Sequence, residues 1–126
     1  MLMLALLLAV AGPQCNREGS QIELDVCADQ DAKAADAALN RVWATTIARA
    51  RKMDGNLTAA DRSSGPPSAD ALLKAQRTWL SFRDAECLAE ALEYRGGSMM
   101  PMIESACAAR LTKARTKDLQ TAFGEN

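Results

Sequence analysis

The side chains that could do chemistry in this chain are 16 acidic residues and four cysteines, and there is no histidine. Without histidine the chain lacks the usual general base, the usual partner of a cysteine nucleophile and a common zinc ligand. No C-x-x-C pair is present, so thiol–disulfide exchange is not indicated. An even number of cysteines in a small chain instead favours two structural disulfides. The four are Cys15, Cys27, Cys87 and Cys107.

Carboxylates alone can supply an acid and a base, as they do in glycosidases. The sequence marks no pair for that role, and it has no glycine-rich phosphate loop and no metal-binding motif. We therefore expect a binding protein that is not an enzyme and that uses no metal and no cofactor. The formal net charge of −1 gives no electrostatic support for binding nucleic acid or an anionic membrane.

The N-terminal residues 1–11 are continuously apolar and end in an Ala-Val-Ala pattern, which is typical of a signal-peptide cleavage site. The segment is shorter than the 20 or so residues that a membrane span needs, and it lacks a basic start. We expect a cleaved signal peptide at 1–11 and a single domain at 12–126; the alternative is a buried N-terminal helix. Gln14 precedes Cys15 where a lipid-attachment motif has a small residue, so no stable membrane anchor is expected. Export predicts a periplasmic or secreted protein, where disulfides persist.

Helix formers dominate the rest of the chain, and aromatic residues make up only 4%. A capping box at Ser20 and Glu23 predicts the start of a helix that runs to about Met53, with Gly55 as its stop. Apolar residues recur along it at spacings of three and four. They are Cys27, Ala35, Leu39, Val42, Trp43, Ile47 and Ala50.

Residues 54–68 are rich in Gly, Pro and Ser and predict a flexible connector, with one possible helical turn at 57–61. Ser68 can cap a second helix that runs to about Arg95. Two neighbouring glycines then predict a tight turn, after which a third helix begins. The predicted fold is all-α, a small antiparallel three-helix bundle with a cysteine-bearing N-terminal extension, linked by two disulfides.

Cys87 and Cys107 stand at equal distances from the predicted turn, so they lie level across a helix hairpin. Cys27 falls near the same end of the bundle, because the first two helices are antiparallel. A pairing of Cys87 with Cys107 and Cys15 with Cys27 fits this geometry. Joining Cys27 to Cys107 and Cys15 to Cys87 is nearly as easy, so spacing leaves the three possible pairings open.

The second helix carries two polar side chains, Gln76 and Arg83, on the same stripe as Cys87, with Trp79 beside them. A buried and unpaired charge is expensive, so these side chains need polar partners. Asn40, a poor helix former inside the first helix, is the candidate partner.

The pattern Q-R-x-W-L-x-F-R-D-x-x-C at 76–87, followed by Gly-Gly-Ser at 96–98 and Cys107, resembles the lysozyme inhibitor LprI-like family of small secreted bacterial proteins. The segments 20–27 and 39–43 resemble that family's first cysteine-bearing segment and its Leu-Asn-x-x-Tyr element. The chain has Asp and Trp where these two segments usually have Asn and Tyr, and the connector carries no match. The resemblance extends over nearly the whole mature chain.

This resemblance implies a helical, disulfide-linked, periplasmic or cell-surface domain with a protein partner, and it implies inhibition of a lysozyme. It also suggests roles for the motif residues. Trp79 and Phe82 are expected in the core with the cysteines, and Arg83 and Asp84 are expected in a polar network. The alternative is that Arg83 or Asp84 binds the partner directly.

An inhibitor of this kind would occlude a hydrolase cleft that works with two carboxylates, and it would present a hydroxyl, an amide or a cation there. The candidate presenters are the connector 54–68 and the predicted turn. The turn residues are Gly96, Gly97, Ser98, Met99 and Met100. The methionines suit adaptable contacts, or they belong to the core. The alternative function is an envelope interaction module that binds another protein and has no activity against lysozyme.

Acidic residues gather at 18–36 and basic residues at 110–117. Acids near the start of a helix and bases near an end suit the helix macrodipole. The alternative is that the acidic segment steers a basic partner, as many lysozymes are.

Overall fold

A computed structural model describes residues 11–124 of the chain. The predicted signal peptide, except for its last residue, lies outside the described residues. The described part contains four helices and no strand. They are α1 (Gln21–Asp54), α2 (Ala59–Ser63), α3 (Ser68–Leu92) and α4 (Met100–Phe123).

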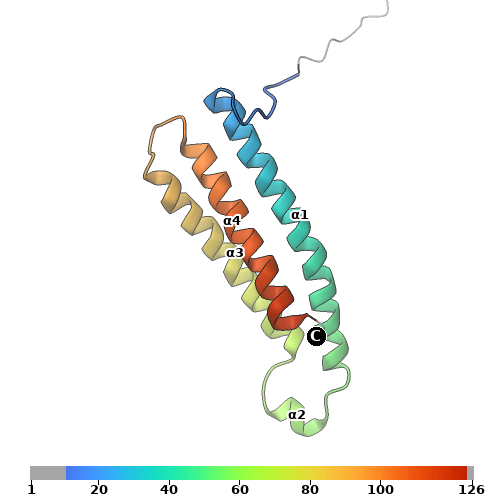
Figure 1. The fold of residues 1–126 in the computed structure, drawn as a ribbon. Helices are drawn as coiled ribbons and strands as arrows, with labels where there is room; N and C mark the ends of the chain where they lie inside the picture. The colour runs from blue at the N-terminus through green and yellow to red at the C-terminus, as the bar shows by residue number, and fades with distance from the viewer. Residues whose placement is uncertain (1–10, 125–126) are drawn as a thin grey trace, which may run out of the picture.

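The three long helices lie side by side, and the short α2 lies in the connector at one end of the bundle (Figure 1). Helices α1 and α4 run in the same direction, and α3 runs against both (Figure 1). Helix α1 packs mainly on α4, and α3 contacts both of them. The predicted all-α bundle of three helices is therefore confirmed. Among the described helices, none combines the length and the apolar character that crossing a membrane requires.

The capping box begins α1 as the sequence predicts. The backbone N–H and the hydroxyl of Ser20 both donate to Oε2 of Glu23, over 2.7 and 2.9 Å. These bonds, the backbone one first, hold the pKa of the Glu23 carboxyl below its usual range. The carboxylate thus stays charged at the positive end of the helix. The helix ends at Asp54 with Gly55 as its C-cap, close to the predicted stop.

Apart from the three buried cysteines, the buried apolar side chains fall into two sets by size. The large members are Leu39, Ile47, Leu72 and Leu119. The small members are Ala28, Ala35, Ala50, Ala91 and Ala109. Small side chains at the contacts let the helix axes approach closely. A large apolar side chain contributes about 1.5–3 kcal/mol when it is buried, whereas alanine contributes much less, so this core is modest for three long helices.

Helix α3 does not begin with the cap that the sequence predicts. Ser68 is its first helical residue, and the preceding residue is Pro67, which offers no side-chain hydrogen bond. The cap comes from Asp54 at the end of α1. Its carboxylate oxygens accept the backbone N–H groups of Ser68 over 2.7 Å and of Ala69 over 2.9 Å. One side chain therefore closes the connector and ties α1 to α3.

These two bonds make the Asp54 cap dependent on pH. The backbone N–H of Ala69 and then that of Ser68 hold the pKa of Asp54 below its usual range. A carboxyl whose pKa is lowered by folding stabilises the protein above its unfolded pKa, and this stabilisation is lost as the pH falls through the folded pKa. We expect Asp54→Ala to lower Tm at pH 7 and to change it progressively less as the pH falls below about 3.9. Thermal unfolding at pH 7 and pH 2 measures this.

The control for this experiment is Asp118→Ala, which removes an exposed carboxylate from α4 without breaking a cap. It should change Tm little at either pH. An Asp54→Ala variant that lowers Tm equally at pH 7 and pH 2 would contradict the cap, since a protonated carboxyl no longer accepts both N–H groups.

The connector holds the short helix that the sequence suggests, shifted by two residues from 57–61 to Ala59–Ser63. Thr58 and Asp61 form its capping box, in which the backbone N–H of Asp61 donates to the Thr58 hydroxyl over 3.1 Å. All of α2 is exposed, and it lies beyond the end of the three-helix bundle (Figure 1).

Ser98, the residue after the two glycines, is not the cap of α4. The helix begins at Met100, its N-cap is Met99, and Pro101 occupies its first turn. Proline suits that place because it has no N–H to leave unpaired. Helix α3 ends at Leu92, about three residues before the predicted end. The connection between α3 and α4 is therefore longer than predicted and comprises residues 93–99.

Candidate functional site

Both disulfides lie at one end of the bundle, as the spacing predicts. Of the pairings that the sequence leaves open, the structure has Cys15–Cys27 and Cys87–Cys107, with Cα–Cα distances of 4.6 and 5.4 Å. Cys27, Cys87 and Cys107 are each only 2% exposed. We call this end, with the four cysteines and the turn 93–99, the disulfide pole. The Cys87–Cys107 bridge joins α3 to α4 near the end of the bundle that carries this turn.

Several backbone N–H groups of the turn 93–99 are paired, which holds the path of its backbone. The N–H groups of Tyr94 and Arg95 donate to the last residues of α3 over 2.9 and 3.1 Å, and that of Gly97 donates to the Tyr94 carbonyl over 2.9 Å. Gly96 has φ +75°, which disfavours any residue with a side chain. A Cβ at Gly97 would lie 3.1 Å from the Tyr94 oxygen. Glycine is therefore favoured at both positions, by the backbone conformation at Gly96 and by the close Tyr94 carbonyl at Gly97.

The turn presents its side chains to solvent. Tyr94 is 44% exposed and Met99 is 37% exposed, and Arg95 and Ser98 are also exposed. Met100, the last of the predicted binding residues, is half-buried at the start of α4. The five candidates from the sequence are thus brought together at one end of the molecule, beside a tyrosine and an arginine that the sequence did not single out.

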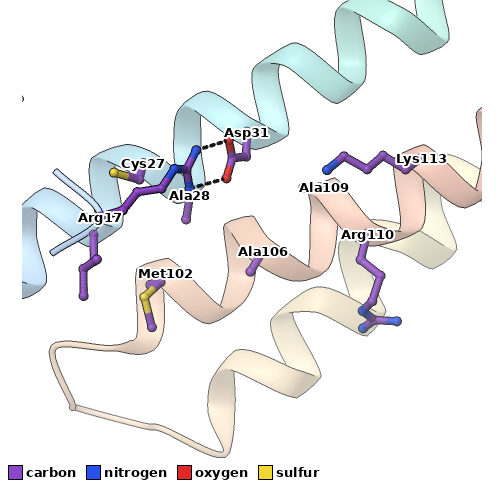
Figure 2. A pocket seen from close by; sticks show the side chains of 10 residues that line it. Arg17, Cys27, Ala28, Asp31, Met102, Ala106, Ala109, Arg110 and Lys113 are labelled. Carbon is purple, nitrogen blue, oxygen red and sulfur yellow. Dashed lines mark hydrogen bonds and ion pairs between the residues drawn. The ribbon is translucent and has the colours of Figure 1, made fainter. Parts of the chain in front are cut away.

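A hollow of about 680 Å³ lies next to the disulfide pole, between α1 and α4 (Figure 2). Its apolar lining comes from Leu24, Ala28, Met102, Ala106 and Ala109. Its charged lining comes from Arg17, Asp31, Arg110 and Lys113. We call it the near hollow.

Arg17 reaches the near hollow from the segment before α1, which the Cys15–Cys27 bridge holds in place. Its guanidinium donates to both carboxylate oxygens of Asp31, over 3.0 and 2.8 Å (Figure 2). The hydrogen bond from Arg17 is the first cause that keeps the pKa of Asp31 below its usual range, and the charge of Lys113 adds to it. Helical periodicity gave no signal for this contact, because Arg17 lies outside the helices.

The acidic segment 18–36 is largely paired within the chain. Its ion pairs join Asp29 to Lys33, Asp31 to Arg17 and Asp36 to Arg83, and Glu23 caps α1. Charges that are paired internally attract a distant partner less than free charges do. The segment therefore gives weaker support for steering a basic partner than its composition suggests.

Arg83 on α3 connects all three long helices. Its side chain is only 14% exposed, and its Nη1 lies 2.8 Å from Oδ1 of Asp36 on α1 and 3.2 Å from the hydroxyl of Thr112 on α4. Asp84 lies on the outside and accepts from Arg83 Nε over 3.0 Å. The motif arginine therefore acts at the centre of the bundle, as the predicted polar network requires.

A second arginine completes the same network. Arg115 on α4 donates from Nε to the buried Gln76 on α3 over 2.9 Å. The guanidinium carbons of Arg83 and Arg115 lie 5.4 and 6.0 Å from the ring centre of Trp79. Both distances fit cation–π contacts. Two cations thus lie against one half-buried tryptophan, which explains why this stripe carries polar residues.

Two expectations for the motif are wrong. Asn40 is exposed, and the partners of Arg83 and Gln76 are Asp36, Thr112 and Arg115 instead. Asp36 lies one helical turn before Asn40, which places it level with Arg83. Phe82 is 54% exposed. The side of α3 that faces the core passes through Trp79 and Arg83, and Phe82 lies on the flank of the helix beside that side.

The fold and the disulfide pole define a small protein of three long helices, linked by two disulfides, that presents an exposed turn with several paired N–H groups. Its described residues contain no group of three or more side chains able to hold a metal ion. A family model described as lysozyme inhibitor LprI matches residues 13–119, and the chain belongs to this family.

One relative is an uncharacterised protein of Rhizobium meliloti (strain 1021). It is 43% identical over 108 residues, which cover 86% of this chain and 77% of the relative. No solved structure matches the chain. The family is one of inhibitors, and its activity implies a protein partner. Two disulfides fit the oxidising surroundings in which such inhibitors typically work.

Proposed function

We propose that this protein is an exported lysozyme inhibitor that binds through its disulfide pole and places the turn 93–99 in the catalytic cleft. Membership of the LprI family supports lysozyme as the target. The observation that carries the mode of binding is the turn itself. It is exposed, it is bent at Gly96 by a positive φ, and it joins two helices that the Cys87–Cys107 bridge holds together.

A turn held in this way loses little freedom on binding. Ordering a flexible loop costs free energy for each side chain and backbone unit that is immobilised, and a preformed loop avoids most of that cost. The paired N–H groups of Tyr94, Arg95 and Gly97 fix the path of the backbone in the free protein. This favours the turn over the connector 54–68, whose two prolines between α2 and α3 have no N–H groups to pair.

The side chains of the turn match the chemistry of a lysozyme cleft. Such a cleft works with two carboxylates, and an arginine can donate charge-assisted hydrogen bonds to them. Arg95 is the exposed cation at the tip, and Ser98 adds a hydroxyl. Tyr94 and Met99 offer exposed apolar surface to the walls of the cleft.

Replacing Arg95 by alanine is expected to raise the inhibition constant for the sensitive lysozyme about tenfold or more, because a central charged contact of about 1.4 kcal/mol or more is lost. The fold should not change, since the Arg95 side chain is exposed. The measurement is inhibition of a panel of lysozymes of different structural types by the oxidised chain from Gly12 to Asn126. The matched control is Arg51→Ala, an exposed arginine at the opposite end of α1.

The possible outcomes test separately whether the protein inhibits lysozyme and whether the turn 93–99 is the inhibitory surface. Inhibition that is unaffected by Arg95→Ala, and also by a bulky substitution at Gly96, would place the inhibitory surface elsewhere. A folded, oxidised sample that inhibits no lysozyme type would contradict the proposed function. It would leave the envelope interaction module with another protein partner as the remaining function.

A further inference from the structure

A second hollow lies farther along the contact between α1 and α4. It is lined by Arg41, Val42, Arg49 and Leu119, among others, and has a volume of about 400 Å³. Arg49 follows Asp31 of the near hollow by five helical turns, so both hollows lie on the same side of α1. We call this second one the far hollow, and the two together the α1–α4 groove.

The groove has a charge that the whole chain lacks. The chain has 15 basic and 16 acidic residues. The residues that line the two hollows, by contrast, include a single carboxylate, Asp31, and five cations. These cations are Arg17, Arg41, Arg49, Arg110 and Lys113. Arg17 is paired with Asp31, and Arg110 is paired with Glu90 of α3, so three of the five cations form no ion pair among the described residues.

Several of these cations keep unused hydrogen-bonding capacity. Arg17 is bound to Asp31, yet its side chain remains 66% exposed. Arg49 donates from Nη1 to the carbonyls of Phe123 and Gly124, which leaves its other guanidinium donors available. Among the described residues, Arg41 and Lys113 form no ion pair, and both are exposed. A partner with carboxylates would therefore meet accessible donors along the groove.

Between the cations the near hollow has an apolar lining with three alanines, and the far hollow has a mixed lining that includes Thr45, Thr46 and Gln120. Leu24, Ala28, Ala106 and Ala109 line the near hollow, and Val42 and Leu119 line the far one. Small side chains on both sides of a groove leave room for the apolar face of another helix. A glycan would gain little from such a lining, whereas an amphipathic peptide would use both its apolar stripe and its charges.

We propose that the α1–α4 groove binds an acidic amphipathic helix of a protein partner, with its apolar stripe on the groove floor and its carboxylates on the cations of both hollows. The surface is separate from the turn 93–99, and the proposal does not depend on lysozyme inhibition. The protein would then bind two partners, a hydrolase at the disulfide pole and an acidic segment along the side.

The test uses two designed peptides of about 20 residues, long enough to extend about 30 Å as helices. Both carry leucines at i, i+3, i+4 and i+7; one has glutamates and the other lysines at the flanking positions. Fluorescence anisotropy with the full oxidised chain measures binding. We expect the acidic peptide to bind at least tenfold more tightly than the basic one, and this preference to weaken as salt rises.

Charge reversal identifies the groove as the binding surface. Lys113→Glu and Arg41→Glu change one cation in each hollow. Each substitution should weaken binding of the acidic peptide several-fold. The double variant should bind the basic peptide more tightly than the acidic one. Arg41→Glu lies far from Asp31, so it stays informative if Lys113→Glu destabilises the fold. The control is Lys74→Glu on α3, which should leave the preference unchanged.

Equal binding of the two peptides, or a preference that survives both reversals, would overturn the proposal. Lysozyme inhibition tests the disulfide pole separately. Arg95→Ala should leave binding of the acidic peptide unchanged, and Arg41→Glu should leave lysozyme inhibition unchanged. Failure of one proposal can therefore be told from failure of the other.

Discussion

Replacing both Cys87 and Cys107 by alanine is expected to lower the free energy of unfolding by about 3 kcal/mol and to weaken lysozyme inhibition as well. The bridge closes a loop of 20 residues, and the loss of conformational freedom in the unfolded chain stabilises the folded state by about that amount. Both cysteines are buried under the turn, so the turn loses its fixed base when the bridge is absent. Urea unfolding and inhibition assays on the same samples measure the two effects.

The other bridge supplies the matched control. Cys15–Cys27 closes a loop of 12 residues, so its replacement by alanines should cost a similar free energy of unfolding, about 3 kcal/mol. It holds the segment before α1 and does not join α3 to α4. Inhibition by this variant, measured well below its unfolding transition, should stay close to that of the wild type. Equal losses of inhibition in both variants would show that stability alone explains them.

Arg83→Met is expected to destabilise the protein by about 2–3 kcal/mol, because it removes charge-assisted hydrogen bonds that join three helices. Methionine keeps most of the apolar stem of arginine, so the decrease in the free energy of unfolding measures the contribution of the guanidinium group. That group is 14% exposed and lies within 3.2 Å of both Asp36 and Thr112. It also lies against the Trp79 ring. Urea unfolding of the purified variant gives the value.

Arg77→Met is the control for this change, since Arg77 is an exposed arginine on the same helix. It should alter the free energy of unfolding by less than about 0.5 kcal/mol. Asp36→Ala should cost less than Arg83→Met, because the Asp36 side chain is 50% exposed and its partner keeps a second carboxylate, Asp84. If Arg83→Met and Arg77→Met are equally stable, the network does not hold the helices together.

Local signals predicted the helices well. The capping box at Ser20 and Glu23, the apolar spacing along α1 and the glycines after α3 each act within a few residues, and each appears in the structure. The same periodicity placed Cys87 and Cys107 at one level, which is where they pair. Such signals depend on neighbouring residues alone, so a single sequence contains them in full.

Contacts between distant segments were harder to predict. The Asp54 cap of α3 comes from another helix, and no pattern around Ser68 indicates it. Periodicity showed that Arg83 faces the core, but the choice of Asp36 over Asn40 depends on the relative heights of two helices. The family resemblance places Phe82 in the core, but its side chain is 54% exposed, because a shared motif does not show which flank of α3 its neighbours leave uncovered.

The two candidate binding surfaces also differ in how far the sequence alone predicts them. The turn 93–99 is continuous in sequence, and its two glycines and Met99 indicate it without any tertiary information. The α1–α4 groove is formed by residues about 80 positions apart, such as Ala28 and Ala109, together with Arg17 from outside the helices. Its charge appears only once two helices are placed side by side, because each helix alone has both acidic and basic residues.

The central claim is that the disulfide pole enters the catalytic cleft of a lysozyme. The most direct test is binding of the oxidised chain to lysozyme, by calorimetry, with and without an oligosaccharide that fills the cleft. We expect the protein to bind at least one lysozyme type, and a saturating oligosaccharide to displace it. Simultaneous binding of the protein and the oligosaccharide, or no binding to any lysozyme type, would contradict the claim.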